Sequence, residues 1–279
     1  MFDTLISAGS LHRNLGSGGL RIVDCRFDLL QPDAGRARYL EAHIPDAVYA
    51  HLDEDLSGPV REDSGRHPLP DAAEQAQTFG RLGIDNNSQV VVYDDVGGMI
   101  AARAWWLLRW LGHRRVALLD GDWSHWVQCG FATESGQAKV APASFDGRPQ
   151  QEMVIETADL VDVGAGGVTL VDARDRDRFR GVSEPIDPVA GHVPGALNLP
   201  CAANLNERGT WKGAAELREL WKQLLGRRIE SPVSVMCGSG VTACHLALSG
   251  YLAGLGEPSV YVGSWSEWIR DAHRPIATG

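Results

Sequence analysis

The stretch Val233-Ser-Val-Met-Cys-Gly-Ser-Gly-Val-Thr-Ala243 decides how this chain is interpreted. Its first four residues form a short apolar run with β-branched side chains, which predicts a buried strand over 233–236. The glycines that follow predict a tight loop, and the apolar residues of 241–252 predict a helix that leaves it. Cys237 therefore lies where backbone N–H groups converge and a helix dipole is positive. Both effects favour the thiolate, which is the nucleophilic form of cysteine.

The composition is that of a globular protein with room for two domains. The chain has 279 residues, of which 44% are hydrophobic and 22% are charged, as in ordinary soluble proteins. Its net charge of −10 argues against nucleic acid or an acidic membrane as the main partner. The sequence shows neither a run of about 18 apolar residues nor the pattern of a signal peptide, so we expect no membrane span.

The five cysteines are odd in number and widely spaced, which is not the pattern of a disulfide framework. Free thiols fit a reducing compartment, and we expect a cytoplasmic protein. Cys25, Cys129, Cys201 and Cys244 are expected to be structural, because buried packing is the usual role of a free cysteine. No Cys–His pair has the spacing of a zinc site, so we expect neither a metal nor a cofactor.

The chain contains an internal duplication, because four blocks recur in the same order at a nearly constant separation. The matched blocks are Ile22–Arg26 with Leu170–Arg174, His43–Ala47 with His192–Ala196, Val90–Asp94 with Val233–Cys237, and Gly121–Trp126 with Gly263–Trp268. Asp94 thus stands in the first half where Cys237 stands in the second. Since the nucleophile occurs in one half, the repeated Asp24, Asp172, His43 and His192 are expected to be structural.

Each half alternates predicted strands with predicted helices. The second half has strands over 168–172, 196–199, 233–236 and 259–262 and helices over 214–225 and 241–252, and the first half has a helix over 101–111. This alternation predicts an α/β fold, with a mostly parallel sheet flanked by helices on both faces in each half. We expect an N-terminal domain over 1–132, a linker over 133–151 and a C-terminal domain over 152–279.

These halves and the loop Cys237–Ala243 resemble the two-domain rhodanese-type sulfurtransferases over essentially the whole chain. The resemblance implies tandem rhodanese-like domains: an inactive N-terminal one with Asp in place of Cys, and a catalytic C-terminal one facing an interdomain cleft. The neutral pair Gly238-Ser239 is similar to the 3-mercaptopyruvate branch, whereas the thiosulfate branch carries cationic residues there. The implied chemistry moves sulfane sulfur from a small anionic donor through a Cys237 persulfide to cyanide, a thiol or a thioredoxin-type reductant.

The resemblance also implies the residues of the site. Arg178 matches the arginine that binds the anionic donor, and Arg180 is a weaker candidate. The 3-mercaptopyruvate enzymes often carry a second arginine shortly after, near Glu184-Pro185, but this chain departs from that pattern and has Ile186-Asp187 there. Ser239 matches a serine for which a triad has been suggested, here with His67 and with either Asp53 or Asp55. The loop residues Gly238, Gly240, Val241, Thr242 and Ala243 would cradle the sulfur with their N–H groups, which the glycines make possible.

Other functions stay open at this point. A Cys-dependent phosphatase shares the fold, but its chemistry needs an arginine six residues after the cysteine, where this chain has Ala243. A non-enzymatic carrier would take up sulfur once without turnover. Among donors we prefer 3-mercaptopyruvate to thiosulfate, because a dianion would gain from more positive charge than this loop offers.

Overall fold

The short apolar runs of the sequence form the strands of two parallel sheets in the computed structural model, which describes residues 1–160, 163–164 and 167–279. Packing divides the chain into two units. Unit 1 comprises Met1–Gly58, Pro70–Gln150 and Glu207–Trp211, and unit 2 comprises Pro59–Leu69, Gln151–Asn206 and Lys212–Gly279. The segment Pro59–Leu69 therefore packs with the half of the chain that carries Cys237. The domain and linker bounds proposed from the sequence stay a prediction.

In unit 1 the strands lie in the order β1-β5-β4-β2-β3, and neighbouring strands are parallel. The run Val90-Val-Val92 of β4 is fully buried, as a central strand of a parallel sheet requires. The elements of this unit are β1 (Leu5–Ser7), α1 (Ala8–Asn14), β2 (Leu20–Asp24), α2 (Ala34–Glu41), β3 (Val48–Tyr49), α3 (Leu52–Asp55), α4 (Ala72–Arg81), β4 (Gln89–Tyr93), α5 (Ala101–Trp110), β5 (Val116–Asp120) and α6 (Asp122–Gln128).

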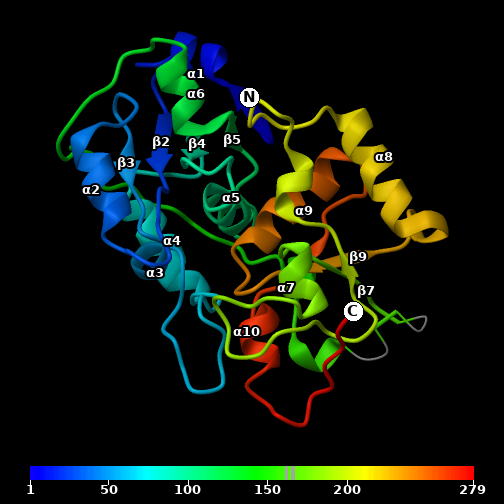
Figure 1. The fold of residues 1–279 in the computed structure, drawn as a ribbon. Helices are drawn as coiled ribbons and strands as arrows, with labels where there is room; N and C mark the ends of the chain where they lie inside the picture. The colour runs from blue at the N-terminus through cyan, green and yellow to red at the C-terminus, as the bar shows by residue number, and fades with distance from the viewer. Residues whose placement is uncertain (161–162, 165–166) are drawn as a thin grey trace. The chain divides into compact units, whose positions relative to one another are not determined.

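Helices cover both faces of the unit 1 sheet, as predicted. On one face, Leu11 of α1 and Trp126 of α6 pack against Val91 and Leu119 of the sheet. On the other face α5 contacts β4 and β5, and all of its side chains are buried, including three tryptophans. Figure 1 shows α1 and α6 on one side of these strands and α5 on the other.

In unit 2 the strands lie in the order β6-β10-β9-β7-β8, again in parallel. Its elements are η1 (Gln151–Met153), β6 (Val154–Ile155), η2 (Thr157–Asp159), β7 (Thr169–Asp172), α7 (Arg176–Arg180), β8 (Leu197–Asn198), η3 (Cys201–Asn204), α8 (Ala214–Leu225), η4 (Gly226–Arg228), β9 (Val233–Met236), α9 (Thr242–Leu252), β10 (Ser259–Tyr261) and α10 (Ser264–Trp268). Each strand takes the place of its counterpart in unit 1, which confirms the duplication.

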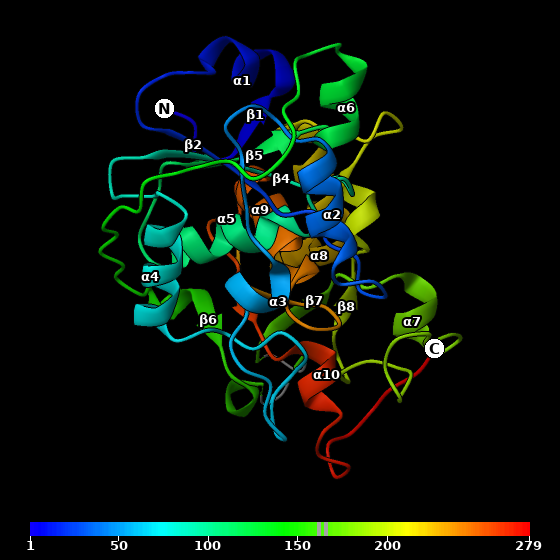
Figure 2. The same cartoon turned by 90° about the vertical axis from the view of Figure 1, so that its left-hand side faces the viewer.

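The unit 2 sheet is also covered on both faces. Phe179 of α7 and Trp265 of α10 pack with Leu170 and Met236 on one face, and α9 contacts β9 and β10 and is itself covered by α8. Figure 2 shows α10 and the helix pair α8–α9 on opposite sides of β7 and β8. No helix in the described part of the chain combines the length and the apolar content needed to cross a bilayer.

The residues repeated in the two halves are structural, as the duplication predicted. In unit 1 a guanidinium nitrogen of Arg26 lies 2.6 Å from the buried carboxylate of Asp24, and in unit 2 Arg174 lies 2.7 Å from Asp172. In each repeated histidine, Nδ1 lies 2.8 Å from a backbone carbonyl oxygen. The carbonyl belongs to Tyr39 in the case of His43 and to Phe179 in the case of His192.

Candidate active site

Cys237 follows β9 at the carboxyl end of the strand and precedes the loop that leads into α9. The backbone N–H of Cys237 donates to the Ser264 hydroxyl at 3.0 Å, and its carbonyl accepts from the N–H of Trp265. The residue is 2% exposed, and Gly240 N–H donates to its Sγ at 3.1 Å. The backbone hydrogen bonds of Cys237 thus hold its thiol next to a loop N–H group. This N–H group stabilises negative charge on the sulfur.

The loop requires glycine at position 240. Gly240 has φ +82°, and a Cβ there would lie 2.2 Å from the carbonyl oxygen of Val262. A side chain at this position would therefore move the N–H away from the sulfur. Of the other loop residues assigned from the sequence, Gly238 follows the cysteine, Val241 is buried, and Thr242 and Ala243 begin α9. Their part in cradling the sulfur stays a prediction.

The remaining cysteines are free thiols. Burial raises the pKa of Cys25 well above its usual range, and burial followed by the charge of Cys237 raises that of Cys201. Cys244 is fully buried, and its thiol donates to the carbonyl of Gly240 at 3.3 Å, so it packs in the helix as predicted. The prediction of buried packing was wrong for Cys129. This residue lies directly after α6, at the end of the helix, and is exposed to solvent.

His67 lies beside Ser239, as the resemblance implied. Its Nδ1 is 2.7 Å from the Ser239 hydroxyl, and both side chains are buried. Asp53 lies on α3 in unit 1, where its N–H donates to Nδ1 of His51 at 3.2 Å. Asp55 accepts from the backbone N–H of His51 at 2.8 Å, and its pKa is raised by burial. The pairing of either aspartate with His67 stays a prediction.

Arg178 belongs to a cluster of buried charges in unit 2. Its Nε donates to both oxygens of Glu184 at 2.8 and 2.9 Å, and one Nη donates to Asp187 at 3.0 Å. Burial is the largest single effect on Glu184 and would raise its pKa, but the hydrogen bonds from Arg178 and from the backbone N–H groups of Asp187 and Ile186 together lower it. Arg180, the weaker candidate, is exposed at the end of α7.

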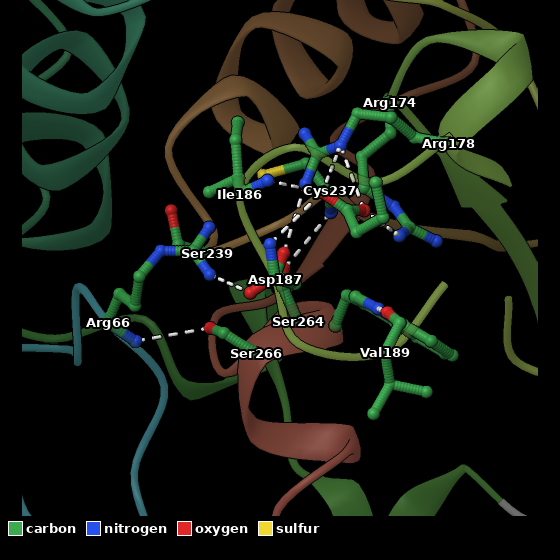
Figure 3. A network of polar contacts seen from close by, with 12 residues as sticks. Arg66, Arg174, Arg178, Ile186, Asp187, Val189, Cys237, Ser239, Ser264 and Ser266 are labelled. Carbon is green, nitrogen blue, oxygen red and sulfur yellow. Dashed lines mark hydrogen bonds and ion pairs between the residues drawn. The ribbon is translucent and has the colours of Figure 1, made fainter. Parts of the chain in front are cut away.

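Sequence reasoning missed Arg66, which the structure brings to the same cluster. The Arg66 guanidinium forms an ion pair with Asp187, and its backbone N–H donates to the Ser266 hydroxyl at 3.1 Å. Figure 3 shows Asp187 between the guanidinium groups of Arg66 and Arg178, close to Cys237. The available signal was that Arg66 directly precedes His67, since a loop that delivers one residue to a site also delivers its neighbour.

The equivalent loop of unit 1 is filled by its own carboxylate. The two oxygens of Asp94 accept hydrogen bonds from the N–H groups of Val96, Gly98, Ile100 and Ala101 at 2.7–3.0 Å. Burial raises the Asp94 pKa to about 6 although these four bonds oppose it. The loop after the fourth strand of this fold thus binds an anion through its backbone N–H groups, and in unit 1 that anion is the Asp94 carboxylate.

Unit 2 holds a thiol beneath a loop of N–H groups at the end of a parallel strand, and the same kind of sheet occurs in unit 1. Together these features define a rhodanese-like protein. The family model described as rhodanese-like domain matches residues 7–129 and 157–271. The chain therefore belongs to the rhodanese-like domain family, and the resemblance drawn from the sequence is confirmed.

Known relatives resemble the chain over almost its full length. It is 46% identical to a probable 3-mercaptopyruvate sulfurtransferase of Pseudomonas aeruginosa, covering 99% of this chain and 98% of the relative. It is 34% identical to the thiosulfate sulfurtransferase of Gallus gallus, covering 96% of this chain and 94% of the relative. The solved 3-mercaptopyruvate sulfurtransferase of Leishmania major superposes with a TM-score of 0.85 at 30% identity, covering 98% of this chain and 75% of that one.

Proposed function

We propose that this protein is a sulfurtransferase that carries sulfane sulfur on Cys237. The observation that carries the proposal is the Gly240 N–H at 3.1 Å from the cysteine sulfur, in the loop equivalent to the one whose N–H groups cradle a carboxylate in unit 1. The same cradle stabilises a thiolate before the reaction and a persulfide after it. Relatives named as sulfurtransferases support this activity.

The reaction has two halves. With 3-mercaptopyruvate as donor, the Cys237 thiolate attacks the donor sulfur, the new S–S bond forms, and the donor C–S bond breaks. The electron pair of that bond leaves as the enolate of pyruvate, which takes up a proton. In the second half an acceptor thiol or cyanide attacks the outer sulfur, and the S–S bond breaks to regenerate the Cys237 thiolate.

Ser239 and His67 supply the proton transfer in this scheme. The 2.7 Å separation of their side chains is that of a strong hydrogen bond, and an imidazole can deliver or receive a proton near neutral pH. The enolate is a stronger base than sulfite, the leaving group from thiosulfate. A proton relay therefore assists 3-mercaptopyruvate more than it assists thiosulfate.

The donor we propose is 3-mercaptopyruvate, with thiosulfate as the alternative. Gly238 and Ser239, the residues after the cysteine, are neutral. The guanidinium of Arg178, which we propose binds the donor carboxylate, is balanced by Glu184 and Asp187. A monoanion fits this charge balance better than a dianion. We further propose a thiol, cyanide or thioredoxin-type acceptor and a cytoplasmic location, which the free thiols support.

Mass spectrometry of the intact protein before and after exposure to donor tests the proposal. We expect one added sulfur atom on Cys237, lost when an acceptor thiol is added, and no addition in Cys237→Ser. Cys129→Ser removes an exposed thiol and should leave loading unchanged. Loading on another cysteine overturns the proposal, and loading without turnover establishes the carrier instead. Faster steady-state use of thiosulfate than of 3-mercaptopyruvate would reverse the choice of donor.

A further inference from the structure

A second guanidinium group lies against the residue that follows the nucleophile. A Cβ placed on Gly238 would lie 3.1 Å from an Nη of Arg66 and 3.3 Å from an Nη of Arg178. The two arginines come from different segments of unit 2, Pro59–Leu69 and α7. They converge on one backbone position, and Figure 3 shows both groups beside Cys237.

Arg66 retains hydrogen-bonding capacity on this side. Its Nε is buried and has no hydrogen-bond partner among the described residues, and a buried donor without an acceptor is costly. The side chain as a whole is 26% exposed, so a small ligand can approach it. A guanidinium with an unsatisfied donor next to a nucleophile is suited to a carboxylate or another small oxyanion.

Asp187 limits the charge of this pair of arginines. One of its oxygens contacts Arg66 and the other contacts Arg178, and its side chain is 1% exposed. Glu184 binds Arg178 as well, and Arg174 is bound to Asp172. Three guanidinium groups therefore face three carboxylates, and the cluster is neutral when all of them are ionised.

We propose that Arg66 is a second donor-binding residue and that Asp187 determines specificity by limiting the site to donors with one negative charge. The inference rests on the proposed sulfurtransferase activity and names the residues that select its donor. The donor carboxylate binds the edges of Arg66 and Arg178 whose Nη groups lie toward Gly238, while Asp187 keeps its contacts. Because the cluster is already neutral, every negative charge of the donor is left without a matching cation. Thiosulfate brings two such charges and 3-mercaptopyruvate brings one, which disfavours thiosulfate.

Steady-state kinetics of Asp187→Asn with both donors test the role of Asp187. The variant keeps the shape of the side chain and removes one negative charge, so kcat/KM for thiosulfate should rise relative to that for 3-mercaptopyruvate by about tenfold. An unchanged ratio overturns the inference for Asp187. If wild-type protein loads sulfur from neither donor, the proposed function itself fails, which is a separate result.

The variant Arg66→Gln tests the second binding residue and does not depend on whether Asp187→Asn folds. We expect KM for 3-mercaptopyruvate to rise by about tenfold with a smaller change in kcat, because a binding contact is lost while Cys237 stays in place. Arg66→Lys should recover part of the loss. Arg61→Gln removes an exposed charge from the same segment and should leave KM unchanged. A fall in kcat with constant KM would show that Arg66 acts only by positioning His67, and would overturn its assignment to donor binding.

Discussion

The Nδ1 atom of His67 lies 2.7 Å from the hydroxyl oxygen of Ser239, although 172 residues separate them in the chain. Both side chains are buried, and Ser239 is two residues beyond Cys237. His67 reaches this position because the segment Pro59–Leu69 packs with unit 2 rather than with the elements that precede it. A titratable side chain, His67, is thus hydrogen-bonded to the hydroxyl of Ser239, close to the nucleophile Cys237.

Replacing His67 should impair turnover more than binding. His67→Gln keeps a hydrogen-bonding group and loses the proton transfer, so we expect kcat with 3-mercaptopyruvate to fall by about 100-fold. Ser239→Ala should have a similar effect, and the double variant should be little worse than either single variant, since the residues act in one relay. Stopped-flow loading and steady-state assays measure these rates. Additive losses in the double variant would contradict a shared role.

Arg178 is the second residue whose role the geometry makes testable. Arg178→Ala should raise the donor KM by about tenfold, because the guanidinium beside Gly238 is lost. Arg178→Lys should recover only part of the binding, since an ammonium group cannot reproduce the two-pronged contact. Arg180→Ala, from the exposed end of the same helix, is the matched control. Equal effects of the Arg178 and Arg180 variants on KM would remove Arg178 from the donor site.

Local sequence signals predicted the fold class and many of the elements, but not β6, α7 or α10 of unit 2. The predicted bounds of α8 and β9 are those observed, α5, α9, β7 and β10 differ by one residue at one end, and β8 is shorter by one residue at each end. These elements follow from apolar periodicity and from residues that mark the ends of helices. Gly213, for example, directly precedes α8, and its N–H donates to the Glu216 side chain at 3.0 Å in the first turn of the helix. The duplication then identified the repeated Asp and His residues as structural.

The site was only partly predictable, because its polar contacts join segments far apart in the chain. Cys237 and Ser239 lie within one motif, and motif matching found them. The pairing of Arg66 with Asp187 spans 121 residues and follows from packing of the segment Pro59–Leu69, which has no periodic pattern. In the sequence Asp187 was only a position lacking an expected arginine. The structure shows that the second arginine near Gly238 is Arg66.

The buried carboxylate of Asp94 should make stability depend on pH. Its pKa in the folded state is raised to about 6 by burial, above its value in the unfolded chain. The stability it contributes is therefore fully present below the unfolded pKa and is lost as pH rises through about 6. Relative to Asp94→Asn, the free energy of unfolding of the wild type should fall between pH 4 and pH 7 by up to about 3 kcal/mol. Urea denaturation across this range measures the difference, and a constant difference would show that Asp94 keeps its ordinary pKa.

Gly240 offers a test that links the backbone of the loop to the chemistry of the thiol. In Gly240→Ala the new Cβ would lie 2.2 Å from a backbone oxygen, at a φ of +82°. The loop must shift, at a cost of about 3 kcal/mol or more in folding stability. Because the shift moves the N–H that donates to the Cys237 sulfur, sulfur loading should slow as well.

Gly209→Ala is the matched control for this effect. Gly209 has a φ of +75° and nothing within 4 Å of an added Cβ, so its alanine variant carries the backbone strain without the collision. We expect a loss of about 1 kcal/mol in the free energy of unfolding and normal loading of Cys237. If Gly240→Ala loads sulfur as fast as Gly209→Ala while losing the larger amount of stability, the Gly240 N–H serves the fold alone. The negative charge on sulfur would then have to be stabilised by other groups.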